Sequence, residues 1–139
     1  MDTYYEGFLL SDDKNLLQTD RVYELLHKTY WAKTRAKDVV EKSIENSLCF
    51  GVYEDGLQIG FARAVTDHAV LFYLCDVVID ENYRGQGLGK ALMKFVSEHA
   101  ELSDLSGWLA TKDAHGLYEK FGYRKDPGHT MLRSEVVIE

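Results

Sequence analysis

The residues whose spacing most suggests chemistry are three glycines at alternate positions, Gly85, Gly87 and Gly89, directly after Arg84. They follow the apolar run LFYLCDVVI and precede an amphipathic segment, so they lie between a predicted strand and a predicted helix. Glycine is a weak helix former, so a cluster at a helix start needs a local reason. Unpaired N–H groups converge at such a start and the helix dipole is positive there, which suits an anion. The pattern indicates a phosphate site, and a tight turn without a ligand is the structural alternative.

Two familiar nucleotide motifs do not fit this segment. A P-loop needs Ser or Thr after its lysine, whereas Ala91 follows Lys90, and Arg84 stands where the first glycine would be. The dinucleotide pattern G-x-G-x-x-G fails as well, because Lys90 stands three residues after Gly87. The phosphate reading therefore requires another class of ligand.

Composition restricts the classes of function. The chain has 139 residues, which suits a single domain, 1–139. Its 16 Lys and Arg against 23 Asp and Glu give a formal net charge of −7, so no nucleic acid partner is expected. The N-terminal stretch lacks a secretory signal pattern and no apolar run reaches transmembrane length. We therefore expect a cytoplasmic protein with no membrane partner.

The residues that bind metals or form disulfides show no such pattern here. Cys49 and Cys75 each lie inside an apolar run, which predicts two buried, reduced thiols. The 5 histidines show no repeated ligand spacing such as HExxH. No metal site is predicted.

The elements that must position the glycine cluster follow from the apolar periods. The predicted order is one strand, two helices, three strands, helix, strand, helix and two strands, or β-α-α-β-β-β-α-β-α-β-β. The approximate ranges are strand 4–10, helices 20–30 and 36–45, a hairpin over 47–65 with its turn at 54–56, strand 70–79, a helix from the glycines to about 100, strand 105–110, a short helix that Gly122 ends, and two terminal strands around 126–128.

Two segments together resemble one known family. VVIDENYRGQGLGKALM closely resembles the coenzyme A pyrophosphate loop of the GNAT superfamily of N-acetyltransferases, and LATKDAHGLYEKFGYRK is similar to the A-x-x-x-Y-x-x-x-G-F signature of that family. Ala114, Tyr118, Gly122 and Tyr123 are in register with the signature. The element order also matches along nearly the full chain. The resemblance implies a mixed α/β domain whose mostly antiparallel sheet has about seven strands, flanked by about four helices.

The same resemblance implies acetyl-CoA as cosubstrate and assigns the residues that would contact it. N–H groups of the glycine loop would wrap the diphosphate, and main-chain groups of the preceding strand would hold the pantetheine arm. Thr111 stands where many members carry Asn. The implied coenzyme contacts are Val77, Val78, Ile79, Arg84, Gly85, Gln86, Gly87, Leu88, Gly89, Lys90 and Thr111. Tyr118 would be the catalytic acid that protonates the departing sulfur.

Three further residues are candidates for the acceptor site. Asp76 interrupts an otherwise apolar strand, and a buried carboxylate needs a partner. It could accept a proton from the acceptor amine or bind its ammonium group, and a structural salt bridge is the alternative. Tyr30 and Trp31 lie in the connection TYWAKTR, which in this fold overhangs the acceptor site. Core packing is the alternative for Trp31.

These observations predict an acetyl-CoA-dependent N-acetyltransferase that acts directly on a primary amine, either a small molecule or a protein amine. No cysteine stands where a nucleophile is expected, so no covalent enzyme intermediate is predicted. A non-catalytic acyl-CoA-binding module is the alternative, and the presence of Tyr118 favours the enzyme. The apolar stretch 136–138 would permit a homodimer.

Overall fold

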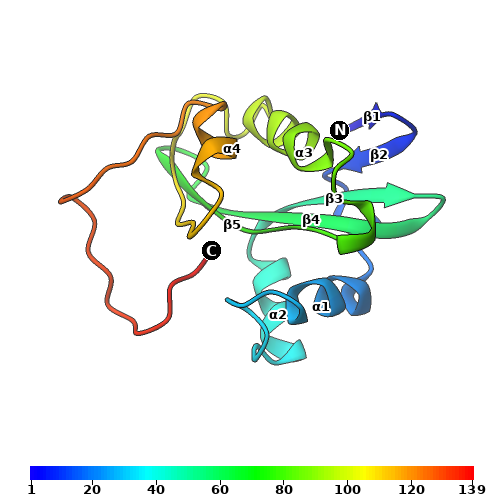
Figure 1. The fold of residues 1–139 in the computed structure, drawn as a ribbon, viewed down its shortest axis with the longest axis horizontal. Helices are drawn as coiled ribbons and strands as arrows, with labels where there is room; N and C mark the ends of the chain where they lie inside the picture. Colours follow the sequence, from blue (N-terminus) through cyan, green and yellow to red (C-terminus); the bar gives the residue numbers. More distant parts are fainter.

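A single six-stranded sheet organises the protein, with two helices on each of its faces (Figure 1). The computed structural model describes residues 1–139. Helices α1 and α2 cover one face and α3 and α4 the other, and the strands follow chain order from β1 to β6. The bounds are β1 Asp2–Tyr5, β2 Phe8–Ser11, α1 Thr19–His27, α2 Lys37–Glu45, β3 Leu48–Glu54, β4 Leu57–Thr66, β5 Leu71–Ile79, α3 Leu88–Ser97, β6 Ser106–Trp108 and α4 His115–Glu119, with short 3₁₀ turns η1 at Lys14–Leu16 and η2 at Glu81–Tyr83.

The mixed α/β domain and its four helices are confirmed, and the sheet is mostly antiparallel as expected. Only β5 and β6 run parallel. The first predicted strand is wrong in detail, because it is a hairpin rather than one strand. Glu6 and Gly7 have φ of 50° and 86°, the conformation of a two-residue hairpin turn, and the same turn recurs at Asp55 and Gly56.

The two predicted terminal strands are not formed, so the sheet has six strands rather than about seven. The segment 124–139 contains no helix or strand and extends away from the body before its end returns beside β5 (Figure 1). The sheet ends at β6, which is only three residues long. So short an edge offers few N–H and C=O groups with which a further strand could pair.

Each face of the sheet has its own apolar core. The larger core contains 15 buried residues, to which α3 contributes Leu88, Leu92, Met93, Phe95 and Val96. The smaller contains 9, from α1, α2, the connection between them and the strands facing them. The helical periods that predicted these elements thus correspond to the buried sides of the helices. No helix combines the length and apolar character needed to cross a membrane.

Strand β5 changes its pairing halfway along. It is parallel to β6 only through Leu71, Phe72 and Tyr73, so its remaining residues have no neighbouring strand on that side. Against β4, its register shifts between the pairs formed by Phe61 and Arg63, where two residues of β5 face one of β4. This is a β-bulge. The second half of β5 has no paired strand along its other edge, because β6 ends at the pair with Tyr73.

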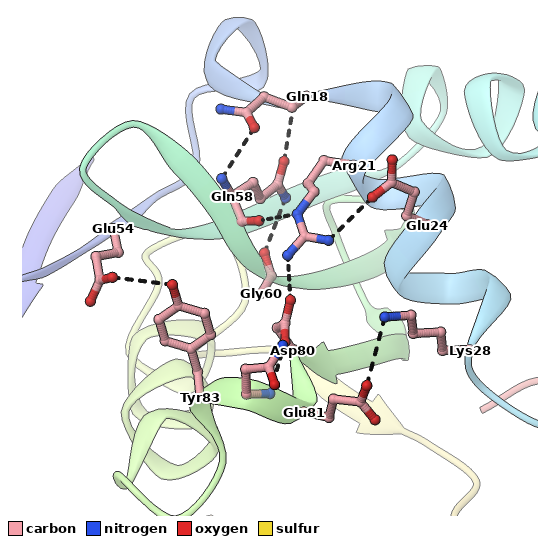
Figure 2. A network of polar contacts seen from close by, with 11 residues as sticks. Gln18, Arg21, Glu24, Lys28, Glu54, Gln58, Gly60, Asp80, Glu81 and Tyr83 are labelled. Atoms are coloured by element: carbon pink, nitrogen blue, oxygen red, sulfur yellow. Dashed lines mark hydrogen bonds and ion pairs between the residues drawn. The ribbon is translucent and has the colours of Figure 1, made fainter.

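A polar network joins α1 to the turn that precedes the glycine loop (Figure 2). The buried carboxylate of Asp80 accepts a hydrogen bond from the Asn82 N–H at 2.8 Å and pairs with Arg21 of α1. Arg21 Nε also donates to the carbonyl oxygen of Gln58, at 2.9 Å. Burial acts to raise the pKa of Asp80, but these donors outweigh it and hold that pKa below its usual value. Arg21 therefore fixes where the chain leaves β5.

Replacing Arg21 with alanine should lower the free energy of unfolding by about 3 kcal/mol, because the buried Asp80 carboxylate would lose its cation. Urea denaturation at neutral pH measures the loss. The difference from wild type should shrink as pH falls through the lowered pKa of Asp80, since protonation removes the charge that Arg21 stabilises. Arg124→Ala is the matched control, because its side chain is 82% exposed and pairs only with Asp126. Equal losses for the two variants would contradict this role of Arg21.

Candidate functional site

The glycine loop presents an uninterrupted run of free amides. No backbone N–H from Arg84 to Lys90 donates a hydrogen bond within the protein, and all but two of these residues are exposed. Gly85 and Gly87 have φ of 82° and 80°, which an L side chain adopts only with strain. The α3 helix begins at Leu88, so its positive dipole end adds to the run. The loop fits a diphosphate, because such a ligand needs many donors and no side chain in its way.

Tyr5 supports this loop from the first hairpin. Its hydroxyl donates to the carbonyl oxygen of Gln86 at 3.0 Å, which turns that carbonyl toward the protein. A Cβ placed on Gly87 would lie 2.5 Å from the Tyr5 oxygen. The loop thus has a fixed shape on its inner side. Tyr5 is a residue of the candidate site that the sequence did not reveal, since the contact joins residues 81 positions apart.

The bulge in β5 turns one amide toward the open edge of the strand. Asp76 has φ of 58°, and its N–H donates to a main-chain oxygen of Glu139 at 2.6 Å rather than to the sheet. Val77, Val78 and Ile79, predicted to hold the pantetheine arm, lie just beyond this residue and past the last β6 pair. Val78 belongs to the smaller core, and the other two pack against the larger one. Their side chains are therefore core residues, as expected.

The Asp76 side chain points away from that edge into a buried ion cluster. Its Oδ2 accepts from Arg35 at 2.8 Å and from Arg63 at 2.9 Å, and its Oδ1 accepts from the Trp31 indole at 3.0 Å. Asp76 is fully buried. Both oxygens have charged or polar donors from the protein, which favours the structural alternative for this carboxylate over a base or an ammonium ligand.

Tyr30 and Trp31 separate into different environments. Tyr30 is 47% exposed, and its hydroxyl donates to the Glu139 side-chain carboxylate. Desolvation and this carboxylate raise the pKa of Tyr30 to about 12. Trp31 is half-buried, packs against the smaller core and stands edge-on to Tyr30. Of the two aromatic residues predicted to face an acceptor, the structure leaves Tyr30 accessible and uses Trp31 in the ion cluster.

Tyr118 lies on α4, where it is half-buried against the larger core. Burial raises the pKa of its phenol to about 12, and the negative charges of Glu139 and Asp113 act in the same direction. Its hydroxyl makes no hydrogen bond within the protein. Thr111 accepts from the Ala114 N–H at 3.0 Å, so it caps the turn before α4.

Contacts of Glu139 show which predicted residues come together. Its main-chain oxygen lies on the Asp76 amide, and its carboxylate lies between the Tyr30 hydroxyl and the Lys112 N–H. The negative charge of Glu139 also raises the pKa of the Tyr118 phenol. The bulge amide, Tyr30 and the α4 turn therefore surround one position, while the glycine loop continues from the end of the same strand. A cavity of about 800 Å³ beside β6 is lined by Tyr118 but by no glycine-loop residue. It therefore does not connect Tyr118 with the glycine loop.

A sequence model described as an acetyltransferase (GNAT) domain matches residues 45–125 of this chain. The chain belongs to the GNAT acetyltransferase family. A relative from Porphyra purpurea, the uncharacterized N-acetyltransferase ycf52, is 30% identical over 125 residues, which cover 85% of this chain and 71% of the relative. The chloroplastic GCN5-related N-acetyltransferase 2 of Arabidopsis thaliana is 37% identical over 71 residues, or 50% of this chain and 28% of the relative. A crystal structure of a GNAT-family protein from Xanthomonas campestris is similar with 38% identity and a TM-score of 0.88, covering 94% of this chain and 95% of that one.

In this GNAT acetyltransferase the two cysteines are free and buried, as the sequence predicted. Desolvation raises the pKa of Cys49 to about 11 and that of Cys75 to about 12. Both thiols are therefore protonated at neutral pH and are weak nucleophiles. Like Tyr5, Arg35, Arg63 and Lys112 are residues of the site to which the sequence analysis gave no role; Arg35 and Lys112 lie inside the quoted segments TYWAKTR and LATKDAHGLYEKFGYRK, whereas no motif surrounds Arg63.

Replacing Asp76 with asparagine should destabilise the GNAT domain by about 3 kcal/mol, because two buried guanidinium groups would share no counter-charge. Denaturant titration followed by tryptophan fluorescence measures the change, since Trp31 reports directly on the cluster. Asp104→Asn is the matched control, because that aspartate is exposed and makes no hydrogen bond. It should change stability by less than about 0.5 kcal/mol. An Asp76→Asn protein with the stability of wild type would show that the ion cluster is not needed for the fold.

Proposed function

We propose that this protein transfers the acetyl group of acetyl-CoA directly to a primary amine, of a small molecule or of a protein. The run of unpaired amides from Arg84 to Lys90 is the observation that supports this most strongly. It stands at the end of a strand whose edge has no paired strand beyond Tyr73, where an extended ligand could lie. Acetyl-CoA would supply a diphosphate for the amides and an acetyl group activated as a thioester.

The bulge amide is suited to the charge that develops during transfer. Attack of an amine on a thioester places negative charge on the carbonyl oxygen, which an N–H donor in a fixed position stabilises. The Asp76 N–H points out of the sheet and already donates to a main-chain oxygen of Glu139 at 2.6 Å. We assign it the oxyanion position, with main-chain groups of Val77, Val78 and Ile79 beside the pantetheine arm. In this proposal the Asp76 carboxylate is a positioning group rather than the base.

Tyr118 is the candidate acid. A pKa of about 12 keeps its phenol protonated at neutral pH, so the proton is available when the sulfur departs. In the proposed step the carbon–nitrogen bond forms, the carbon–sulfur bond breaks and the thiolate takes the phenolic proton. The surplus proton of the amine leaves to solvent, and the Tyr118 phenolate takes a proton from solvent to restore the phenol.

Direct transfer agrees with the state of the cysteines. A covalent acetyl-enzyme would need a thiolate, whereas both thiols are buried and carry raised pKa values of about 11 and about 12. The amine must then attack the thioester itself. Both substrates would be bound at once, with the acceptor entering beside Tyr30.

Substituting phenylalanine for Tyr118 should lower kcat about a hundredfold and leave the dissociation constant of acetyl-CoA unchanged, because only proton donation is lost. Steady-state thiol release and calorimetry measure the two quantities. Tyr123→Phe is the matched control, since that tyrosine packs edge-on against Tyr118 and its pKa is also raised by burial to about 12. It should keep wild-type kcat. A Tyr118→Phe enzyme with unchanged kcat would exclude Tyr118 as the acid.

Replacing Gly87 with alanine should weaken acetyl-CoA binding by at least about tenfold. A Cβ at φ of 80° and 2.5 Å from the Tyr5 oxygen would shift the amides that bind the diphosphate. Gly56→Ala controls for backbone strain alone, because Gly56 has φ of 83° in the β3–β4 turn and no neighbour within 4 Å. Calorimetry should find its affinity unchanged. Wild-type affinity in Gly87→Ala would refute the assignment of the loop.

A further inference from the structure

The segment 124–139 places one of its own carboxylates in the proposed acceptor site. Its end returns to the body beside β5 (Figure 1), where the Tyr73 hydroxyl donates to the Ile138 oxygen at 2.6 Å. Glu139 then makes contacts at both ends: its main-chain oxygen with the Asp76 amide at 2.6 Å, and its side-chain carboxylate with the Tyr30 hydroxyl and the Lys112 N–H. The N–H contact measures 3.0 Å.

The spacing of the atoms in Glu139 between these contacts predicts the chemical structure of an acceptor. In the proposed reaction the oxygen on the Asp76 amide is that of the attacked carbonyl. The carbonyl carbon of Glu139 then stands for the acetyl carbon, and its Cα for the attacking nitrogen. From that position two methylene groups lead to the carboxylate held by Tyr30 and Lys112.

We propose, building on the function proposed above, that the acceptor is an amine with a carboxylate two carbons from its nitrogen. β-Amino acids have this spacing, as do the α-amine and side-chain carboxylate of aspartate. Glu139 occupies the same subsite and competes with the acceptor. The amide at Asp76 fixes the reacting end, and the Tyr30 hydroxyl with the Lys112 N–H recognises the acid end.

The local charge supports a carboxylate at this position. The ion cluster beneath the bulge contains two guanidinium groups, Arg35 and Arg63, and one carboxylate, Asp76, so it leaves one positive charge unbalanced. The Lys112 ammonium lies 5.3 Å from the centre of the Tyr30 ring. The chain as a whole carries a net charge of −7, and the Asp113 carboxylate also acts on Tyr30, so this positive charge is local and partly offset. Hydrogen bonds to a charged group in such a region are strong ones.

The test compares three amines of equal length with the full chain and acetyl-CoA: β-alanine, its amide and propylamine. Thiol release should give a kcat/KM for β-alanine at least about tenfold above that of the two uncharged amines, because only its acid end accepts from Tyr30 and Lys112. Glycine and γ-aminobutyrate, one carbon shorter and longer, should fall below β-alanine. Equal use of β-alanine and its amide would overturn the inference while leaving the acetyltransferase function intact. If the protein neither binds acetyl-CoA nor acetylates any amine, both the inference and the proposed acetyltransferase function would be overturned.

Two variants test the subsite itself. Tyr30→Phe should reduce the preference for β-alanine over propylamine about tenfold, since it removes one donor to the carboxylate. Tyr4→Phe, at a 73% exposed tyrosine whose hydroxyl makes no hydrogen bond, should leave the preference unchanged. Glu139→Ala should lower the KM for β-alanine about tenfold, because a tethered competitor acts at an effective concentration on the order of millimolar. An unchanged preference in Tyr30→Phe, or an unchanged KM in Glu139→Ala, would show that Glu139 and the acceptor do not share this subsite.

Discussion

The site depends on one buried carboxylate. Asp76 sits in mid-strand with a left-handed backbone, a conformation that costs free energy for any residue other than glycine. The structure holds it there with two guanidinium groups and an indole, all bound to the same side chain. With the side chain fixed inward, the amide must point outward. The ion cluster thus sets the direction of a single N–H group, which the fold alone would have left in the sheet.

A second carboxylate, Asp80, acts four residues later on the same strand end. It is held by Arg21 from α1 (Figure 2). Asp76 is held in the same way by Arg35, from the segment that follows α1. The two pairs fix the two points on which ligand geometry depends, the bulge and the start of the glycine loop. Helix α1 and the connection that follows it therefore do more than cover apolar strands. They anchor the end of β5 by charge, from the face opposite α3.

Much of this arrangement was predictable because it depends on residues close in sequence. The glycine loop, the β3–β4 turn and the buried sides of the helices follow from local spacing, and all appear in the structure. The Glu6 and Gly7 turn had a local signal too, but the surrounding run YYEGFLL also fits a single strand. The partners of Asp76 could not be predicted, since Trp31 and Arg35 lie 45 and 41 positions away and only the packed fold brings them together. The terminal strands failed for a related reason: a suitable strand sequence needs an edge to pair with.

The bulge also determines which core each later residue of β5 enters. Leu74 packs in the core beneath α3, but after the extra residue it is Val77 and Ile79 that pack there, while Val78 enters the core beneath α1 and α2. Pairing every residue of this stretch regularly, without the bulge, would send all three valine and isoleucine side chains to the wrong face. Deleting Asp76 would give a more regular sheet and keep these faces, because Leu74 and Val77 would again stand two positions apart, but it would remove the amide that points outward. Sequence redesign that rewards ideal strands would favour this change. The extra residue therefore sets which face of the sheet each later residue of β5 takes. Keeping it constrains every insertion or deletion between residue 71 and the glycine loop.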